Sequence, residues 1–289
     1  MSKLGSVSVG GSNPVRIMGI LNLSPESFYK KSITTNKEMI AIKTRKMEAE
    51  GADFIDVGGM STAPYLKTVV PQKTESERIT RAIKIIQQIS NLPISIDTCR
   101  SEVAKSALEL GVDIINDISG LKYDKDMPKI VEKYNPSLVL CAFSKNLVIG
   151  NQIIQTKNLL RESIKIAKSA QISDNHIVVD PAIGFFRKKG KGAFFTRINS
   201  DWIKRDLLIL NNLRSIKLRH PLLVSVSRKS FIGNLLQIKN PNDRLCGSLA
   251  AESIAVLNGA DIIRTHNVQE TKEAITITQK LSHRFKKGL

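Results

Sequence analysis

The chain has 289 residues, of which 42% are hydrophobic and 5% aromatic, and 44 Lys and Arg against 26 Asp and Glu give it a formal net charge of +18. This length favours one large domain or two ordinary ones and allows a substantial core. The few aromatics and the lack of a basic, aromatic-rich segment argue against a surface that stacks nucleic-acid bases. We interpret the charge as a basic, solvated surface, with an anionic partner, either nucleic acid or a phosphorylated small molecule, as the alternative.

The cysteines and the hydropathy pattern bear on the compartment. Cys99, Cys141 and Cys246 are scattered, and no Cys-x-x-Cys occurs. We therefore expect a reducing compartment rather than a disulfide framework or a zinc site. No run approaches the roughly 18 apolar residues of a membrane helix, and residues 1–13 lack the apolar core of a signal peptide. These features predict a cytoplasmic protein that contacts no membrane.

Short apolar runs alternate with amphipathic segments along the whole chain. Strands are predicted at residues 16–21, 54–57, 94–98, 113–116, 137–141, 176–179, 222–226 and 261–264, and helices at 37–50, 74–89, 101–110, 126–134, 156–170, 201–213, 243–257 and 269–281. The second helix opens with Thr74-Glu75-Ser76-Glu77, which predicts a capping box with Thr74 as N-cap. Gly-Ala-Asp-Phe-Ile-Asp at 51–56, Gly-Val-Asp-Ile-Ile-Asn at 111–116 and Gly-Ala-Asp-Ile-Ile-Arg at 259–264 form a loose internal repeat.

Eight strands, each followed by a helix, predict a single-domain α/β protein with the TIM (β/α)8 barrel fold, because right-handed crossovers close the parallel strands into a barrel. An open doubly wound sheet is the competing architecture. Against it, no Gly-x-Gly-x-x-Gly follows the first strand and no P-loop occurs. We place the barrel at residues 16–282, after a flexible N-terminal segment at 1–15 and before a basic tail at 283–289.

Polar side chains stand at or just past the carboxyl ends of most predicted strands. In a barrel this end carries the active site, so these side chains should converge on one mouth. They are Asn22, Asp56, Asp97, Asn116, Asp180, Lys229, Arg264 and His266. One such residue alone is better explained as a structural hydrogen-bonding group, whereas eight at the same relative position indicate a site.

The converging side chains sort into two chemical sets. Asp97, Asn116 and Asp180 offer acceptors that suit the adjacent N–H donors of an aminopyrimidinone ring. The other set offers donors that suit a phosphate or pyrophosphate, and it comprises Asn22, Lys229, Arg264 and His266. Together the two sets predict a ligand in which a polar heterocycle is joined to an anion.

Seven motifs in order resemble dihydropteroate synthase. They are Met-Gly-Ile-Leu-Asn at 18–22 continuing into Ser-Pro-Glu-Ser-Phe at 24–28, Gly-Gly-Met-Ser-Thr-Ala-Pro at 58–64, Ser-Ile-Asp-Thr at 95–98, Ile-Ile-Asn-Asp-Ile-Ser-Gly at 114–120, Asp-Pro-Ala-Ile-Gly-Phe at 180–185, Ser-Arg-Lys-Ser-Phe-Ile-Gly at 227–233 and Arg-Thr-His-Asn-Val at 264–268. The resemblance spans about residues 16–281. Motifs of this number in family order are highly specific.

The resemblance implies a reaction and a set of site residues. The amine of p-aminobenzoate would attack the methylene of 6-hydroxymethyl-7,8-dihydropterin pyrophosphate, and pyrophosphate would leave with Mg²⁺, in folate biosynthesis. The residues that it implies for the pterin are Asp97, Asn116, Asp180 and Lys229. Those implied for the pyrophosphate are Asn22, Arg264 and His266, with Asn22 also at the metal. Those implied near the aminobenzoate are Phe28, Thr62 and Ser227. The implied catalytic set is Asn22, Asp97, Lys229, Arg264 and His266. The family also implies a homodimer.

Two loops depart from the family pattern. Ala63 stands where the family usually has Arg, and Met60 where it has Glu, while the first loop reads Glu-Ser-Phe-Tyr-Lys-Lys-Ser at 26–32. A lost guanidinium removes a bidentate anion contact. We hypothesise that Lys30, Lys31 or Lys67 supplies the missing charge. The change at position 63 also leaves open a larger aminobenzene derivative as acceptor. We expect the basic segment 187–189 to be a solvated loop.

Three other interpretations remain from the sequence. A pterin-binding methyltransferase would need the acceptor set but not the motifs at 227–229 and 264–266, whose presence counts against it. A non-catalytic homologue with altered loops would bind pterin without turnover. A basic nucleic-acid binder would show salt-sensitive binding to random DNA without pterin affinity.

Overall fold

The structure, a computed structural model, describes residues 1–24, 36–65 and 69–282. Eight parallel strands pair in the order β11-β12-β3-β4-β5-β6-β7-β8. Their bounds are β3 Arg16–Asn22, β4 Phe54–Gly58, β5 Ile94–Asp97, β6 Ile114–Asp117, β7 Ser137–Cys141, β8 Ile177–Asp180, β11 Leu223–Val224 and β12 Ile262–Thr265. A bridge between Val179 and Leu222, with Val179 N–H donating to the carbonyl of Pro221 at 3.0 Å, joins β8 to the β11 end. The predicted TIM barrel is confirmed, and the open-sheet alternative was wrong.

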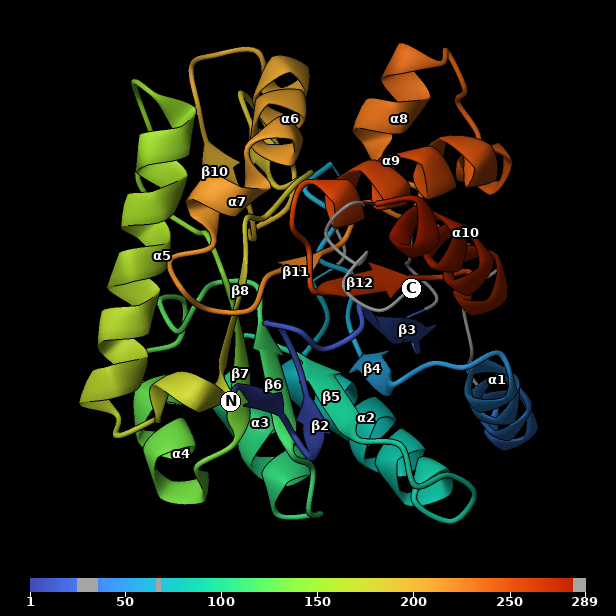
Figure 1. Ribbon diagram of the computed structural model, residues 1–289. Helices are drawn as coiled ribbons and strands as arrows, with labels where there is room; N and C mark the ends of the chain where they lie inside the picture. The colour runs from blue at the N-terminus through green and yellow to red at the C-terminus, as the bar shows by residue number, and fades with distance from the viewer. Residues whose placement is uncertain (25–35, 66–68, 283–289) are drawn as a thin grey trace.

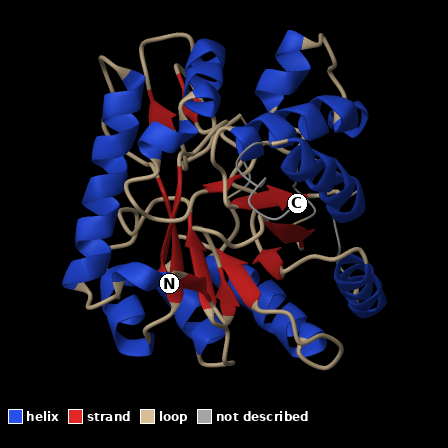
Figure 2. Cartoon of the chain, viewed as in Figure 1, coloured by secondary structure: helices blue, strands red, loops and turns tan. Residues whose placement is uncertain are grey.

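Helices surround the strands on the outside (Figures 1 and 2). They are α1 Lys37–Ala49, α2 Gln72–Ile86, α3 Ser101–Leu108, α4 Met127–Tyr134, α5 Gln152–Ser169, α6 Trp202–Asn211, α7 Leu213–Ile216, α8 Ser230–Leu235, α9 Leu245–Leu257 and α10 Val268–Leu281, with short 3₁₀ turns at Asp174–His176 and Pro241–Asp243. The outward side chains of the strands and the inward side chains of the helices form the larger core; Ile55 and Val57 on β4 and Ile79 and Ile83 on α2 belong to it. Among the described residues, none of these helices has the length and apolarity needed to cross a membrane.

Several predicted boundaries differ from the structure. Helix α2 begins at Gln72 with Pro71 at the N-cap position, so the prediction that Thr74 caps this helix was wrong. Proline fixes the backbone angle φ near the helical value, and it starts the helix there without a side-chain cap. The six-residue α8 was not predicted, and the long 182–200 segment contains a short parallel pair, β9 (Phe186–Arg187) and β10 (Thr196–Arg197).

Residues 1–15, expected to be a flexible segment, instead contain an ordered hairpin. Strands β1 (Lys3–Leu4) and β2 (Val7–Ser8) pair antiparallel. Leu4 and Val9 are buried in a second apolar cluster with inward-facing side chains from seven barrel strands: Met18, Phe54, Ile114, Val139, Val178, Leu223 and Ile262. The backbone N–H of Gly5 donates to Ser137 Oγ at 3.0 Å. The hairpin therefore closes the amino end of the barrel, which we call the floor.

The strand period places the polar residues directly above this floor. Successive side chains on a strand point to opposite faces, so residues two apart lie on the same side. On four strands a residue of the floor cluster is followed two positions later by a polar residue. These pairs are Phe54 and Asp56, Ile114 and Asn116, Val178 and Asp180, and Ile262 and Arg264. A layer of charged and amide groups thus fills the barrel interior one layer toward the carboxyl end.

Candidate active site

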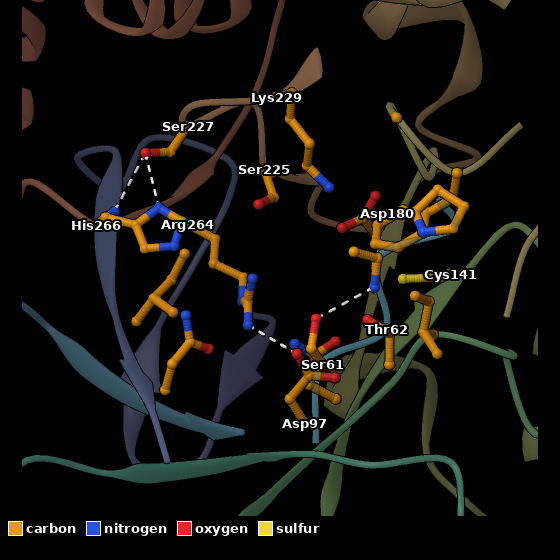
Figure 3. A pocket seen from close by; sticks show the side chains of 18 of the residues that line it. Ser61, Thr62, Asp97, Cys141, Asp180, Ser225, Ser227, Lys229, Arg264 and His266 are labelled. Carbon is orange, nitrogen blue, oxygen red and sulfur yellow. Dashed lines mark hydrogen bonds and ion pairs between the residues drawn. The ribbon is translucent and has the colours of Figure 1, made fainter. Parts of the chain in front are cut away.

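A pocket opens at the carboxyl end of the barrel, and it encloses about 830 Å³ out to its open mouth, a size typical of small-molecule sites. The residues that the family resemblance assigned to the site, where the structure describes them, all line it: Asn22, Thr62, Asp97, Asn116, Asp180, Ser227, Lys229, Arg264 and His266. Asp56, the remaining strand-end carboxylate, is fully buried beneath the pocket and does not line it. Figure 3 shows His266, Ser227 and Arg264 on one side and Lys229 and Asp180 on the other. Phe28 lies outside the described residues. The two chemical sets expected from the strand ends are therefore brought together in one pocket.

Arg264 is held by two carboxylates. Its Nε donates to Asp56 Oδ2 at 2.6 Å and its Nη2 donates to Asp97 Oδ2 at 2.8 Å. Asp56 is fully buried and also accepts hydrogen bonds from Ser95 Oγ at 2.6 Å and from Asn116 Nδ2 at 3.3 Å. Burial by itself would lower the pKa of the Arg264 guanidinium, but Asp56 and Asp97 outweigh it and raise that pKa. The arginine therefore stays charged and fixes the position of Asp97.

Asp97 combines opposing influences. Burial, with a smaller contribution from Asp56, raises the pKa of its carboxyl to about 7, and Arg264 opposes that rise. The adjacent guanidinium favours the ionised form, which predominates above about pH 7. Ionised Asp97 can then accept two parallel N–H bonds from a ligand that enters the pocket, which adds geometric specificity.

Asp180 and Lys229 form the opposite side of the pocket. Asp180 Oδ1 accepts a hydrogen bond from the Ala182 N–H at 2.7 Å. Burial lowers the pKa of Lys229 to about 8, against the effect of Asp180, and its ammonium lies 3.9 Å from the centre of the Phe185 ring. Gly184 has φ +89°, and a Cβ there would come within 2.8 Å of Lys229 Cδ. Only glycine therefore lets the chain turn at this point and leave room for the lysine.

Ser227 and His266 lie on the same side of the pocket as Arg264 (Figure 3). Ser227 Oγ lies 3.1 Å from His266 Nδ1 and accepts the His266 backbone N–H at 3.3 Å. Burial lowers the pKa of His266 well below its ordinary value, and Arg264, Arg228 and Lys229 act in the same direction. His266 is therefore neutral at pH 7, with one ring nitrogen protonated.

Arg228 holds the turn that carries Ser227 and Lys229. Its backbone is left-handed, with φ +57°, a conformation that is costly for a non-glycine residue. Its guanidinium donates to Asn267 Oδ1 at 2.7 Å and to the carbonyl of Asn242 at 2.7 Å. These bonds compensate the backbone strain, so the turn presents both neighbouring side chains to the pocket.

The loop after β4 forms the rim. Thr62 and Ala63 line the pocket there, and the carbonyl of Pro64 accepts the N–H groups of Lys191 and Gly192 at 2.8 and 3.1 Å. Lys30, Lys31 and Lys67, the residues hypothesised to replace the missing Arg, lie outside the described residues.

The basic segment 187–189 is only partly the solvated loop that the sequence predicted. Arg187 is buried, its guanidinium stacks on Trp202 at 3.8 Å, and it donates to Ser230 Oγ at 2.7 Å. The prediction was wrong for this residue, because an aromatic face and a hydroxyl accept the guanidinium. The two lysines that follow Arg187 are exposed.

Asp56 is the residue whose role the sequence left unassigned. It was noted only as one strand-end carboxylate, whereas the structure makes it the common acceptor for Arg264, Ser95 and Asn116. The available signal was its position two residues after Phe54 in an otherwise apolar strand. Its partners are 39 to 208 positions away, so the pairing depends on barrel closure.

The barrel and its two-sided polar pocket define an enzyme that binds a small polar heterocycle joined to an anion. The sequence profile of pterin binding enzymes matches residues 18–266. Dihydropteroate synthase of Clostridium beijerinckii is 36% identical over 284 residues, which cover 98% of this chain and 100% of the relative. The chain belongs to the dihydropteroate synthase family of pterin-binding enzymes.

Solved structures agree with this assignment. A dihydropteroate synthase from Coxiella burnetii in complex with pteroic acid has a TM-score of 0.79 and 34% identity, covering 92% of each chain. The enzyme from Xanthomonas albilineans with 4-aminobenzoic acid has a TM-score of 0.81 and 29% identity, covering 93% of this chain and 94% of that one. Relatives of this kind favour the synthase over the methyltransferase and nucleic-acid interpretations.

Proposed function

We propose that this pocket condenses 6-hydroxymethyl-7,8-dihydropterin pyrophosphate with p-aminobenzoate or a related aminobenzene, releasing pyrophosphate in folate biosynthesis. The observation that carries the proposal is the convergence of an acceptor set and a donor set in one pocket. The relatives in complex with pteroic acid and 4-aminobenzoic acid support the two substrate classes.

The acceptor set, together with Lys229 from the donor set, would bind the pterin ring. Asp97 and Asp180 would accept the ring N–H donors, Asn116 would supply an amide, and Lys229 would donate to a ring carbonyl. The carboxylates also favour the positive charge that grows on the pterin methylene as the bond to oxygen breaks. Arg264 donates a hydrogen bond to Asp97 and fixes its position. The position of the pterin ring on Asp97 would therefore depend on that of Arg264.

The donor set would stabilise the departing pyrophosphate. Negative charge develops on its oxygens, and Arg264, with neutral His266 as a hydrogen-bond donor, would stabilise that charge from the wall of the pocket. Asn22 lines this part of the pocket and offers an amide oxygen, a ligand type that Mg²⁺ accepts beside substrate phosphates and water. Bound Mg²⁺ would neutralise charge on the leaving group.

The acceptor amine requires little activation, because an aryl amine is already a nucleophile. Thr62 and Ser227 lie at the rim and side of the pocket through which the amine would approach. Their role is to orient the aminobenzene toward the methylene. Proximity of this kind supplies much of the rate enhancement in two-substrate reactions.

Turnover is the direct test. The purified protein, given the dihydropterin pyrophosphate, Mg²⁺ and p-aminobenzoate, should release pyrophosphate only when both substrates are present. Chelation of Mg²⁺ should abolish release, because the leaving group would lose its counter-charge. A matched variant, Lys189→Ala on the exposed side of the 187–189 segment, should leave the rate unchanged.

A different pattern of results would contradict this assignment. Tight binding of the pterin without pyrophosphate release would argue against p-aminobenzoate as the acceptor. The next assay would then use a ribosylated aminobenzene as the acceptor. Binding without turnover on any aryl amine would indicate a non-catalytic homologue. The absence of pterin binding would reject the proposal.

We further propose a homodimer in a reducing, cytoplasmic compartment. Apolar side chains are exposed on the neighbouring helices α9 and α10, namely Ile254, Leu257, Ile277 and Leu281, and all three cysteines are unpaired. Sedimentation equilibrium should give a mass of twice 32.0 kDa, and Ile277→Glu should halve it by placing a charge in an apolar interface. A wild-type mass of 32.0 kDa would contradict the dimer.

A further inference from the structure

The loop after β4 contributes a continuous stretch of chain to the pocket. The five residues from Ser61 to Tyr65 all line it, and none of them belongs to a helix or a strand. We call residues 59–65 the acceptor loop, because its Thr62 lies where the aminobenzene would approach. A segment without regular backbone pairing depends on groups outside it for its position. The position of the acceptor loop is therefore set by the residues that hold it.

Glu75 of α2 packs directly against the start of the acceptor loop. A Cβ on Gly59 would come within 3.0 Å of both Glu75 Cγ and the Glu75 carbonyl oxygen. Three residues further along α2, Arg78 donates from Nη1 to the Gly59 carbonyl at 3.0 Å. The loop thus begins in contact with α2, and the position of Glu75 determines where the backbone of Gly59 can lie.

The carboxyl group of Glu75 is fully buried and joins two other segments of the chain. Thr98, which follows Asp97, donates from Oγ1 to Glu75 Oε1 at 2.8 Å. Arg100 donates from Nη1 to Glu75 Oε2 at 2.8 Å and to the carbonyl of Val70 at 2.9 Å. Glu75 is therefore bonded to the turn after Asp97 and, through Arg100, to the chain that leads into α2.

The charges of this network are largely removed from water. The side chains of Arg100 and Glu75 are 10% and 0% exposed. Burial raises the pKa of the Glu75 carboxyl, and the bond from Thr98 and the charges of Arg100 and Arg78 oppose that rise. Removing one partner of a buried ion pair leaves the other charge unpaired, so a change at Glu75 or Arg100 should disturb everything that the pair holds.

The far end of the acceptor loop is held by the segment that follows β9. The carbonyl of Pro64 accepts the backbone N–H groups of Lys191 and Gly192 at 2.8 and 3.1 Å. A Cβ on Gly190 would come within 2.7 Å of the same oxygen. The two amide protons therefore report whether the loop is in place, in the free protein and without turnover.

We propose that Glu75 is a positioning residue for the second substrate, which holds the acceptor loop in place by packing against Gly59 and by pairing with Arg100. Glu75 is not among the residues that line the pocket, so it acts through the loop and does not touch a substrate. The inference rests on the proposed function, in which Thr62 orients the aminobenzene. A displacement of about 1 Å between two reactants can cost about a hundredfold in rate.

Amide hydrogen exchange of the free protein, followed by NMR, tests this role directly. In Glu75→Gln, the amides of Lys191 and Gly192 should exchange about tenfold faster than in the wild type, because a displaced loop withdraws the Pro64 carbonyl that protects them. Glu77→Gln, an exposed position on the same helix, is the matched control and should exchange as the wild type does.

Variants of Arg100 test the same network from its other partner. Arg100→Met should also speed exchange at Lys191 and Gly192, whereas Arg100→Lys should do so less, because an ammonium can still donate to both Glu75 and Val70. The control is Arg81→Met, which is exposed on α2. Arg100→Met decides the question if Glu75→Gln does not fold, because burial raises the pKa of Glu75 and the unpaired carboxyl can take up a proton.

Gly190→Ala is the positive control for the readout, because the added methyl group would displace the Pro64 carbonyl and should speed exchange at Gly192. Lys189→Ala should leave that rate unchanged. Wild-type exchange at Lys191 and Gly192 in both Glu75→Gln and Arg100→Met would overturn the proposal.

Kinetics give a second and independent readout. Glu75→Gln should lower kcat/KM for p-aminobenzoate by about a hundredfold. The affinity for the dihydropterin pyrophosphate alone, measured by calorimetry, should be little changed, because Arg264 still holds Asp97. Equal losses for the two substrates would mean that Glu75 supports the whole barrel and would overturn the proposal. If neither the wild type nor any variant turns over while exchange responds as expected, the proposed function fails and the anchoring of the loop by Glu75 stands.

Discussion

Arg264→Ala should abolish measurable turnover and lower the free energy of unfolding by about 3–5 kcal/mol, because it leaves Asp56 and Asp97 buried without their cation. Urea denaturation and pyrophosphate release measure the two effects. The loss of stability should be larger at pH 8 than at pH 5, because carboxylates without the arginine gain protons as pH falls and then carry no unpaired charge.

The matched control is Arg16→Ala at the opposite end of the barrel. Arg16 pairs with Asp53 at 3.0 Å, and their side chains are 24% and 23% exposed, so solvent screening limits the expected loss to about 1 kcal/mol or less. Equal losses in the two variants would contradict the idea that the buried pairing of Arg264 organises the site.

Asp97→Asn should lower kcat/KM for the dihydropterin pyrophosphate by about a thousandfold while the fold survives. An asparagine presents one acceptor and one donor, so one of two parallel ring N–H groups would face a donor and lose its partner. Arg264 retains Asp56 as its partner, which preserves the barrel interior. Calorimetric titration with the pterin and circular dichroism separate the two effects.

The comparison variant is Asp53→Asn, a carboxylate outside the pocket. It should bind the pterin as the wild type does. Unchanged pterin affinity in Asp97→Asn would show that this carboxylate is not a ring ligand and would transfer the role to Asp180.

The sequence predicted the barrel because its signals are local and repeated. Apolar runs of four to seven residues that end on polar side chains fix both the strand period and the end of each strand, as at Asp97 and Asn116. Parallel strand ends meet at one edge, so the site followed from the fold without any knowledge of contacts.

Features that depend on distant partners were missed. The pairing of Asp56 with Arg264 spans 208 positions, and no local pattern encodes it. Glu252 is the one carboxylate in the otherwise largely apolar helix Leu245–Leu257, and this isolation could have indicated a buried acid. Its hydrogen-bond partner, Thr271, belongs to another helix, so the sequence does not predict the pairing. The hairpin at the floor was missed because two-residue strands in a Ser/Gly-rich segment give no periodicity.

The floor hairpin has a consequence for the order of events during folding. Gly5 bonds to a side chain 132 positions later, and Leu4 belongs to an apolar cluster that extends to Ile262. Leu4 leaves the ribosome long before those strands exist, so its docking must wait until the barrel has nearly closed. Contacts this remote in sequence close slowly. The hairpin is thus synthesised early but packs against the barrel late. Its apolar side chains therefore stay exposed, and accessible to chaperones, until the barrel closes.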